Sequence, residues 1–245
     1  WVAPASRAEL LTAALHDTAT RQPGQRARLI FDANGHGVSM AARDTNFRRM
    51  IDEADVVHAD GGFLVTASRW LTGKKVAERS ATTDMIHDFA NGAGDKMSFY
   101  LLGGSEKVNA ETAQIMQKTY PSLRIAGRRN GYFSRDEEEA VIAEINAARP
   151  DILWVGLGKP LEQEFCLRVR DRLDVAWIIT CGGCYNYITG DYPRAPEWMQ
   201  RTNLEWVHRA ATKPKQLLWR YLTTTPHALL VVARQSTRET QIRCT

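Results

Sequence analysis

Residues 55–84 read DVVHADGGFLVTASRWLTGKKVAERSATTD, and the first part of this stretch decides the fold. The apolar run from Asp55 to Ala59 predicts a short buried strand, and Asp60-Gly61-Gly62 predicts the turn that ends it. A helix-compatible apolar run follows, from Phe63 to Leu71. A strand that passes through a glycine turn into a helix is the unit from which parallel α/β sheets are built.

The same unit recurs along the chain, although not as a true sequence repeat. Further apolar strands are expected at residues 28–31, 97–102, 123–126, 151–155 and 175–180, each followed by a turn with glycine or a carboxamide. Helices are expected at residues 5–20, about 40–53, 106–120 and 135–148, and Ser134 with Glu137 forms a capping-box pair for the last of these. The fold class predicted is α/β, with a largely parallel, doubly wound, Rossmann-like sheet.

The composition is that of an ordinary globular protein. The 245 residues are 44% hydrophobic and 24% charged, and the net charge of +4 is too small to indicate a nucleic-acid partner. The longest apolar block, Ala228–Ala233, is far shorter than the ~20 residues that span a bilayer, and residues 1–28 lack the apolar run of a secretory signal. The four cysteines (Cys166, Cys181, Cys184 and Cys244) have no disulfide-framework spacing, so a reducing cytoplasm is expected.

The basic residues are concentrated at the C-terminal end. Residues 194–245 hold nine Lys or Arg against three Asp or Glu, which leaves 23 basic and 25 acidic residues for the rest. We therefore divide the chain into an α/β core, residues 1–195, and a helical, basic appendage, residues 196–245, which Pro214 and Pro226 are expected to divide into short helices. Tryptophans and basic residues there favour docking to a membrane surface or a partner, and the appendage is also expected to close the site. For Trp198 to Arg209, a helical layer packed on the sheet is an equal alternative.

Asp60 has two interpretations. Side chains just beyond the carboxyl end of a parallel strand line the ligand crevice of such sheets, which favours a catalytic carboxylate. Asp is also a common N-cap, so Asp60 could simply cap the helix that follows it. The spacing alone does not choose between the two.

Several other turns suit an anionic ligand, because glycine lets backbone N–H groups approach a phosphate. Such turns are Gly103-Gly104, Gly156-Leu157-Gly158 and Gly182-Gly183, but none completes a dinucleotide or P-loop fingerprint. Cys181 and Cys184 have the spacing of a redox or zinc pair, but without further ligands we favour a structural role, and no metal site is predicted. Glu162 and Glu164 would suit a helix N-terminus, whereas Gln163 could hydrogen-bond a sugar or phosphate.

Taken together, these residues resemble the WecG/TagA/CpsF family of bacterial glycosyltransferases, from about Leu29 to Tyr221. The markers, in chain order, are Ala59-Asp60-Gly61, Leu101-Leu102-Gly103-Gly104, Gly131-Tyr132-Phe133, Val155-Gly156-Leu157-Gly158 with Gln163-Glu164, Gly190 with Arg194-Ala195-Pro196, Leu204-Glu205-Trp206 with Arg209, and Arg220-Tyr221. Each is weak alone, and their order is specific.

The resemblance implies an inverting transfer of a sugar from a UDP-sugar to a polyprenyl-diphosphate-linked saccharide, in cell-surface polysaccharide synthesis. It implies a peripheral enzyme on the cytoplasmic face of the membrane, with no cofactor beyond the donor substrate. Asp60 would be the general base, which fits the need to deprotonate an acceptor hydroxyl. Residues expected to contact the substrates are Asp32, Asn34, Arg79, Gly103, Gly104, Gly131, Tyr132, Gly156, Gln163, Gly183, Asn186, Arg194, Arg209 and Arg220.

The sequence also departs from the family pattern. Asp32 stands where a Thr is usual, so a second carboxylate is expected to face the site, and two close carboxylates would raise one pKa. Pro160 and Gln163 are separated by two residues instead of one, Thr82-Thr83-Asp84 replaces Gly-x-Asp, and Asn186 replaces Asp. We therefore do not assume the N-acetylmannosamine donor of the best-known members.

Two other functions fit parts of the sequence. A catalytically silent nucleotide-sugar-binding or scaffold protein would bind UDP without transfer. A Rossmann-type oxidoreductase is disfavoured by the missing dinucleotide fingerprint. The sequence leaves open whether the chain forms a homo-oligomer.

Overall fold

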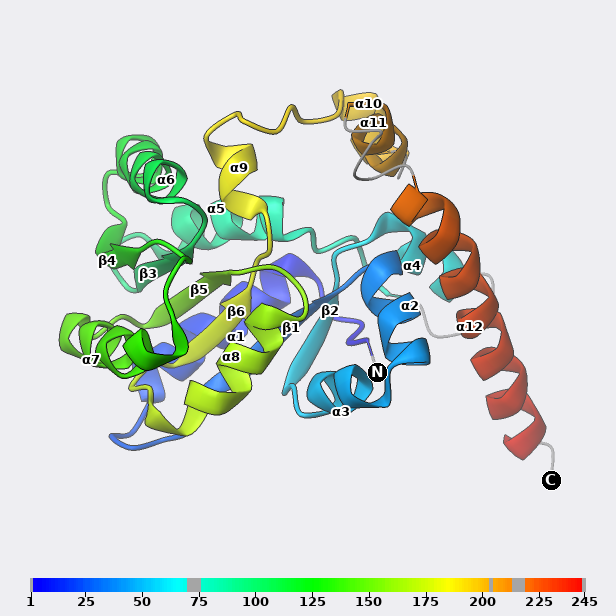
Figure 1. Cartoon of the computed structure of the whole chain (residues 1–245), viewed down its shortest axis with the longest axis horizontal. Coiled ribbons are helices and arrows are strands. Elements are labelled where there is room, and N and C mark those ends of the chain that lie inside the picture. The colour runs from blue at the N-terminus through cyan, green and yellow to red at the C-terminus, as the bar shows by residue number, and fades with distance from the viewer. Residues whose placement is uncertain (1, 70–75, 203–204, 213–218, 244–245) are drawn as a thin grey trace.

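The protein is described by a computed structural model that covers residues 2–69, 76–202, 205–212 and 219–243 (Figure 1). Its centre is one parallel sheet of six strands in the order β2-β1-β6-β5-β3-β4. The strands are β1 (Arg28–Ala33), β2 (Val56–Ala59), β3 (Ser98–Gly103), β4 (Arg124–Arg129), β5 (Ile152–Gly156) and β6 (Trp177–Thr180). All six overlap the expected apolar runs, so the predicted fold class is confirmed.

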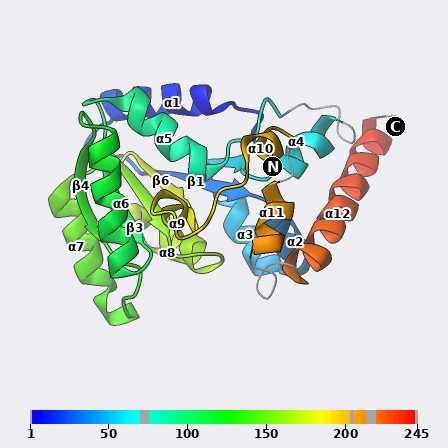
Figure 2. The same ribbon diagram turned by 90° about the horizontal axis from the view of Figure 1, so that it is seen from above.

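Helices cover both faces of the sheet (Figure 2). They are α1 (Arg7–Thr20), α2 (Gly35–Arg43), α3 (Thr45–Asp52), α4 (Gly62–Ala67), α5 (Thr82–Ala93), α6 (Glu106–Thr119), α7 (Glu138–Ala148), α8 (Leu161–Val169), α9 (Cys184–Ile188), α10 (Glu197–Arg201), α11 (Glu205–Thr212) and α12 (Trp219–Arg243). Short 3₁₀ turns at Arg135–Glu137 and Arg170–Arg172 precede α7 and follow α8. The Ser134–Glu137 capping box is present.

Alternate residues of the five strands other than β4 face two separate cores. Phe31, Leu153 and Ile178 face the core under α2, α3, α7 and α8. Trp154 and Trp177 face the other core, under α1, α5 and α6. Because side chains alternate between the faces of a strand, strands that are apolar throughout are buried on both sides, as a doubly wound sheet requires.

The helix expected at about 40–53 is wrong as a single element. The structure has two helices there, α2 and α3, which meet at Asp44. The Asp44 carboxylate accepts hydrogen bonds from the backbone N–H groups of Asn46 (2.8 Å) and Phe47 (3.2 Å). A side chain that caps a new helix competes with continuation of the old one, which is why the apolar periodicity alone missed this break.

The division of the C-terminal segment at Pro226 is also wrong, because α12 continues through this residue. Proline removes one helical hydrogen bond at a cost of about 3 kcal/mol. Packing compensates for it here: α12 lies along α2, Ala228 is fully buried in the core, and Ser39 Oγ lies 3.0 Å from His227 Nδ1 (Figure 1). Pro214 lies outside the described residues.

The apolar block of α12 is divided between core and solvent. Val231 and Val232 pack against the core, whereas Leu229 and Leu230 are 42% and 57% exposed. α12 therefore packs on the body and also presents apolar side chains to its surroundings, and docking to a membrane surface stays a prediction. Among the described helices, none is long and apolar enough to cross a membrane.

Candidate functional site

A cavity of about 380 Å³ opens at the carboxyl ends of β1, β2, β5 and β6. These strands lie where the two halves of the sheet meet, the usual ligand site of an open α/β sheet. The walls consist of Asp32, Asn34, Gly35, His36, Asp60, Gly61, Gly62, Phe63, Arg79, Thr82, Thr83, Gly158, Lys159, Glu162, Cys181, Gly182, Gly183, Cys184, Tyr187, Glu205 and Thr225. The last two come from α11 and α12, so the C-terminal segment contributes to the site.

Asp60 is fixed by the start of α5, not by the helix that follows it in sequence. The N-cap of α4 is Gly61, and no side chain caps that helix, so the interpretation of Asp60 as its cap is wrong. Asp60 Oδ1 instead accepts hydrogen bonds from the backbone N–H (2.9 Å) and the hydroxyl (3.0 Å) of Thr82. A carboxylate is favourable at the positive end of a helix, so α5 holds Asp60 at the cavity wall with one oxygen engaged.

A buried ion-pair cluster forms another wall. Lys159 Nζ lies 2.5 Å from both carboxylate oxygens of Asp32 and 3.7 Å from Glu162 Oε1. Asp32 also accepts hydrogen bonds from Asn34 Nδ2 (3.2 Å) and Thr180 Oγ1 (3.3 Å). Several partners satisfy the same carboxylate, which fixes its orientation.

Glu162 is held by backbone instead of solvent. Its Oε2 accepts N–H groups from Gly158 and Gly182, each at 3.1 Å, and its side chain is fully buried. Its interpretation as an acidic residue that suits a helix N-terminus is therefore incomplete. Glycines at both donor positions let the loops after β5 and β6 converge on one carboxylate.

The pKa values of this cluster follow from burial and mutual attraction. Burial would raise the pKa of Asp32, but Lys159 and His58 outweigh it and hold this pKa below its usual value. Burial would lower the pKa of Lys159, and Asp32 with Glu162 reverses this into a raised pKa. Burial raises the pKa of Glu162 to about 7, against the attraction of Lys159. In this cluster the raised carboxyl pKa is therefore that of Glu162, whereas the pKa of Asp32 is lowered.

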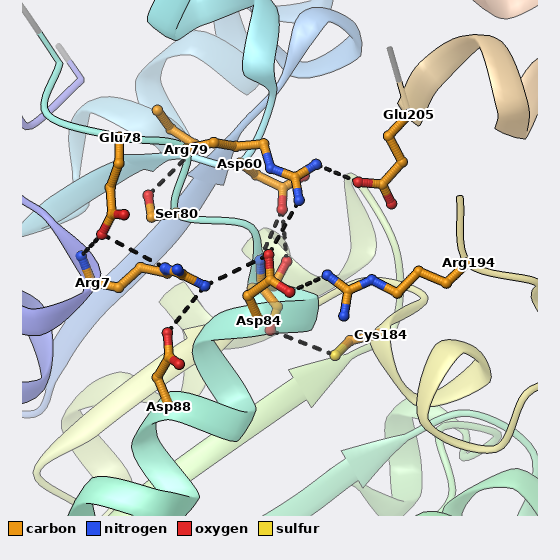
Figure 3. Close-up of polar contacts among 12 residues, drawn as sticks. Arg7, Asp60, Glu78, Arg79, Ser80, Asp84, Asp88, Cys184, Arg194 and Glu205 are labelled. Carbon is orange, nitrogen blue, oxygen red and sulfur yellow. Dashed lines mark hydrogen bonds and ion pairs between the residues drawn. The ribbon is translucent and has the colours of Figure 1, made fainter. Parts of the chain in front are cut away.

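Arg79 lies in a network of charges beside Asp60 (Figure 3). Its guanidinium forms an ion pair with Glu205 of α11 and donates to Asp84 Oδ2 at 3.1 Å. Asp84 also pairs with Arg194 and, at 3.6 Å, with Arg7. Burial would lower the pKa of Arg79, but Glu205 and Asp84 raise it. The network joins α1, α5, α11 and the segment after α9 around one cavity-lining cation.

The structure brings part of the predicted set together. Asp32, Asn34, Asp60, Arg79 and Gly183 line the cavity. Gly103, Gly104, Gly131, Tyr132, Gly156, Gln163, Asn186 and Arg194 do not line it. Arg209 and Arg220 belong to α11 and α12, but their side chains lie outside the described part of the structure. Substrate contact remains a prediction for every one of these residues.

Three of the glycines outside the cavity have a packing reason of their own. A Cβ on Gly103 would lie 2.2 Å from the carbonyl oxygen of Gly156, and one on Gly156 would lie 2.8 Å from that of Gly182. A Cβ on Gly131 would lie 2.7 Å from Leu157 Cδ2. The ends of neighbouring strands therefore approach more closely than any larger residue allows.

Glu162 lines the cavity, where Gln163 was expected, whereas Gln163 is buried. Gln163 is fully buried, donates to Glu162 Oε1 at 3.3 Å, and has no hydrogen bond at its own Oε1 among the described residues. Glu162, two residues after Pro160, faces the cavity instead. The extra residue after Pro160 accounts for this, since each residue advances a helix by about 100°.

The cysteine pair also lies at the cavity. Cys181 and Cys184 are both buried thiols, and the turn between them closes with a 3.0 Å hydrogen bond from Cys184 N to Cys181 O. The glycine turn was expected, but the helix α9 that begins directly at Cys184 was not. Burial raises the pKa of Cys181 well above its usual range, which suppresses thiolate chemistry.

Sequence reasoning missed Lys159, Thr82 and Glu205. Lys159 had a usable signal, because it directly follows a glycine turn at a strand end. Glu205 is one of three acidic residues in a basic segment, which marks it as a partner for a cation elsewhere. Thr82 carries no such signal, because its hydrogen bonds to Asp60 depend on the position of the start of α5 next to the end of β2.

Comparisons with known proteins identify relatives of this chain. The sequence model described as the glycosyl transferase WecG/TagA/CpsF family matches residues 2–242. Two relatives are named N-acetylglucosaminyldiphosphoundecaprenol N-acetyl-beta-D-mannosaminyltransferase. The Bacillus spizizenii protein is 28% identical over 92% of this chain and 86% of its own length, and the Bacillus subtilis protein is 29% identical over 82% and 77%. The chain therefore belongs to the WecG/TagA/CpsF family and is a glycosyltransferase.

Proposed function

We propose that this glycosyltransferase moves a sugar from a UDP-sugar to a saccharide carried on a polyprenyl diphosphate, with inversion at the anomeric carbon. The observation that carries the proposal is the position of Asp60 at the wall of the cavity, with Oδ1 held by Thr82. The names of the two relatives, which specify an undecaprenol-diphosphate acceptor, support the acceptor class.

Asp60 acts as the general base in this proposal. Among the described residues, Oδ1 is the only one of its oxygens with a hydrogen bond, which leaves Oδ2 for an incoming hydroxyl. The acceptor oxygen attacks the anomeric carbon, its proton passes to Asp60, and the bond to the UDP oxygen breaks. One displacement on one face of the sugar inverts the anomeric configuration, and a positioned base contributes roughly 10²–10⁴-fold to such a step.

The leaving UDP needs positive charge. Arg79 supplies it at the cavity wall, where Glu205 and Asp84 set the direction of its guanidinium. Arg209 and Arg220, on the helices next to the cavity, are further candidates. Arginine can bind phosphate oxygens bidentately, so the proposal assigns this role to arginines, without a metal.

The C-terminal segment would bring the enzyme to its lipid-linked acceptor at the inner face of the cell membrane. Trp219, Leu222, Leu229 and Leu230 are 75%, 61%, 42% and 57% exposed on α12. Their spacing places them on one side of the helix, away from the side that carries Ala228. An exposed apolar side on a helix from a basic segment is typical of a membrane-surface helix.

Transfer with a chemically defined acceptor tests the proposal. The protein is incubated with a panel of UDP-sugars and a polyprenyl-diphosphate-linked saccharide, UDP release is measured, and NMR gives the anomeric configuration of the product. We expect acceptor-dependent UDP release and a β-linked product from an α-linked donor. Retention of the α configuration would contradict the single-displacement role of Asp60. Acceptor-independent release alone would contradict the assigned acceptor class.

A further inference from the structure

The proposed role of Asp60 as general base does not account for the wall formed by Asp32, Lys159 and Glu162. Their side chains are 6%, 9% and 0% exposed, yet all three line the cavity. Buried charges are costly unless they are paired and hydrogen-bonded, as these are. Such a cluster at the wall of a cavity presents polar groups in fixed directions to a bound ligand.

The charges of the cavity wall constrain the ligand. Over the described part of the chain, the lining carboxylates are Asp32, Asp60, Glu162 and Glu205, and the lining Lys and Arg side chains are Lys159 and Arg79. Each of these two cations is already bonded to a carboxylate. The wall at Lys159 therefore has no surplus of positive charge, because the charge of Lys159 is offset by Asp32 on one side and by Glu162 on the other.

An uncharged polyhydroxyl group fits such a wall. Sugar hydroxyls can donate to carboxylate oxygens and accept from an ammonium or carboxamide group, so they can add to the hydrogen bonds that the wall already makes. A further carboxylate would meet like charge at Asp32 and Glu162 in a region of low dielectric, where repulsion is poorly screened. It could bind only by drawing Lys159 away from Asp32.

We infer that Asp32, Lys159 and Glu162 form the subsite for the sugar ring of the donor and select an uncharged glycosyl group over a hexuronosyl group. The inference rests on the proposed function, in that the donor is a UDP-sugar. It adds a substrate class that follows from the charges of this chain: Asp32 and Glu162 make the wall acidic, and Lys159 neutralises only part of it.

The selection of an uncharged over a hexuronosyl group depends on pH through the ionisation of Glu162. The groups that face it are Lys159 and Cys166 near or on its own helix, Asp32 of β1, and Cys181 and Tyr185 beyond β6. Burial raises the pKa of Glu162 to about 7, whereas the pKa of Asp32 is lowered and that of Lys159 is raised. Between pH 6 and pH 8 Glu162 gains negative charge, so rejection of a uronosyl group strengthens over that range.

Calorimetric binding of matched donors tests the inference. The probes are UDP, the pair UDP-glucose and UDP-glucuronic acid, and the pair UDP-galactose and UDP-galacturonic acid. Within a pair, the sugars differ only in a CH₂OH or carboxylate group at C6. For at least one pair at pH 8, we expect the uncharged donor to bind at least tenfold more tightly, and the ratio to fall at least threefold at pH 6.

Two variants test whether the charge of the Glu162 side chain, and not its shape, causes the selection between donors. Glu162→Gln removes the titrating charge and keeps an oxygen for the two backbone donors, so its ratio should be reduced at pH 8 and nearly independent of pH. Glu164→Gln makes the same change two residues along α8, outside the cavity lining, and should keep the wild-type ratio. If Glu162→Gln does not fold, the pH dependence of the wild-type ratio decides alone.

The possible results distinguish this inference from the proposed function. Equal or tighter binding of the uronosyl donors, with UDP itself bound, would overturn the selection and leave the proposed function standing. A ratio that is the same at pH 6 and pH 8 would remove Glu162 from the subsite. Failure of UDP and of every UDP-sugar to bind would contradict the proposed function, and the inference with it.

Discussion

The properties of single residues in this site depend on groups from distant parts of the chain that contact them. Glu162 illustrates this, since its backbone donors Gly158 and Gly182 belong to loops that follow different strands. Position in a helix alone would make Glu162 a solvated first-turn residue. Burial between two loops instead makes it a carboxyl group that titrates near neutral pH.

The raised pKa of Glu162 has a consequence for stability. It lies at about 7, above the ordinary value of 4.5, so the folded state binds more protons than the unfolded state between these pH values. The contribution of this group to the free energy of unfolding therefore falls as pH rises from about 5 to 7, by at most about 3 kcal/mol at 1.36 kcal/mol per pKa unit. His58, whose pKa burial lowers, acts in the opposite direction, so a difference between variants is needed.

Urea unfolding at pH 5, 6, 7 and 8 makes that comparison. The stability of wild type minus that of Glu162→Gln should decrease as pH rises through this window. Glu164→Gln should show the pH dependence of wild type. A difference between wild type and Glu162→Gln that stays constant, or grows with pH, would show that Glu162 is already ionised at pH 5.

At the scale of elements, the carboxyl ends of neighbouring strands contact each other closely. Gly103 of β3 has φ 129° and faces the backbone of Gly156 at the end of β5. A side chain there would push apart two strands that pair from Phe99–Ile152 to Gly103–Gly156. The loop that carries Lys159 begins directly after β5, so this contact also determines where that lysine lies.

Gly103→Ala should therefore be severely destabilising. Backbone strain of about 1–3 kcal/mol adds to overpacking of similar size, so we expect a loss of roughly 3 kcal/mol or more in the free energy of unfolding. Gly24→Ala is the matched control, because Gly24 also has a positive φ, of 76°, but no atom within 4 Å of the added Cβ. Its cost should be about 1 kcal/mol. Equal costs in urea unfolding would refute the contact between β3 and β5.

The elements were largely predictable, and the reasons for the exceptions are physical. Apolar runs followed by turns located all six strands; five of these strands are buried on both faces, which leaves no alternation along them, whereas β4 is only partly buried. The break at Asp44 and the continuity through Pro226 depend on a cap and on packing against α2, which local periodicity does not contain. In the site, its strand-end position pointed to Asp60 and the family resemblance pointed to Asp32 and Asn34, whereas Thr82 and Glu205 reach the cavity only through the tertiary fold.

At the scale of the whole molecule, the C-terminal segment joins the site to the surface. Thr225 of α12 lines the cavity, Ala228 packs in the core, and Leu229 next to it is exposed. Deleting residues 196–245 would therefore uncover α2 and remove Glu205 from Arg79, in addition to removing any membrane contact. Substitution of exposed side chains separates these effects, where truncation does not.

Replacement of Trp219, Leu222, Leu229 and Leu230 by glutamine should weaken binding to anionic phospholipid vesicles at least tenfold. Each of these side chains is exposed, so the core should be unaffected, and the apolar area available to the membrane falls. Cosedimentation with vesicles measures the effect, and circular dichroism checks the fold. Leu161→Gln is the control, because Leu161 is 60% exposed on α8, outside this segment. Unchanged vesicle binding by the fourfold variant would refute docking through α12.

The central claim is that Asp60 takes the proton of the acceptor hydroxyl. The most direct measurement is the turnover of Asp60→Asn with a UDP-sugar and a polyprenyl-diphosphate-linked acceptor, with UDP affinity measured on the same sample. Asp95→Asn, an exposed residue in the loop before β3, provides the matched control. We expect kcat to fall by about 10²-fold or more for Asp60→Asn, with UDP binding within a few-fold of wild type, because asparagine keeps the bonds from Thr82 but is not a base. Near-normal turnover by Asp60→Asn would contradict the claim.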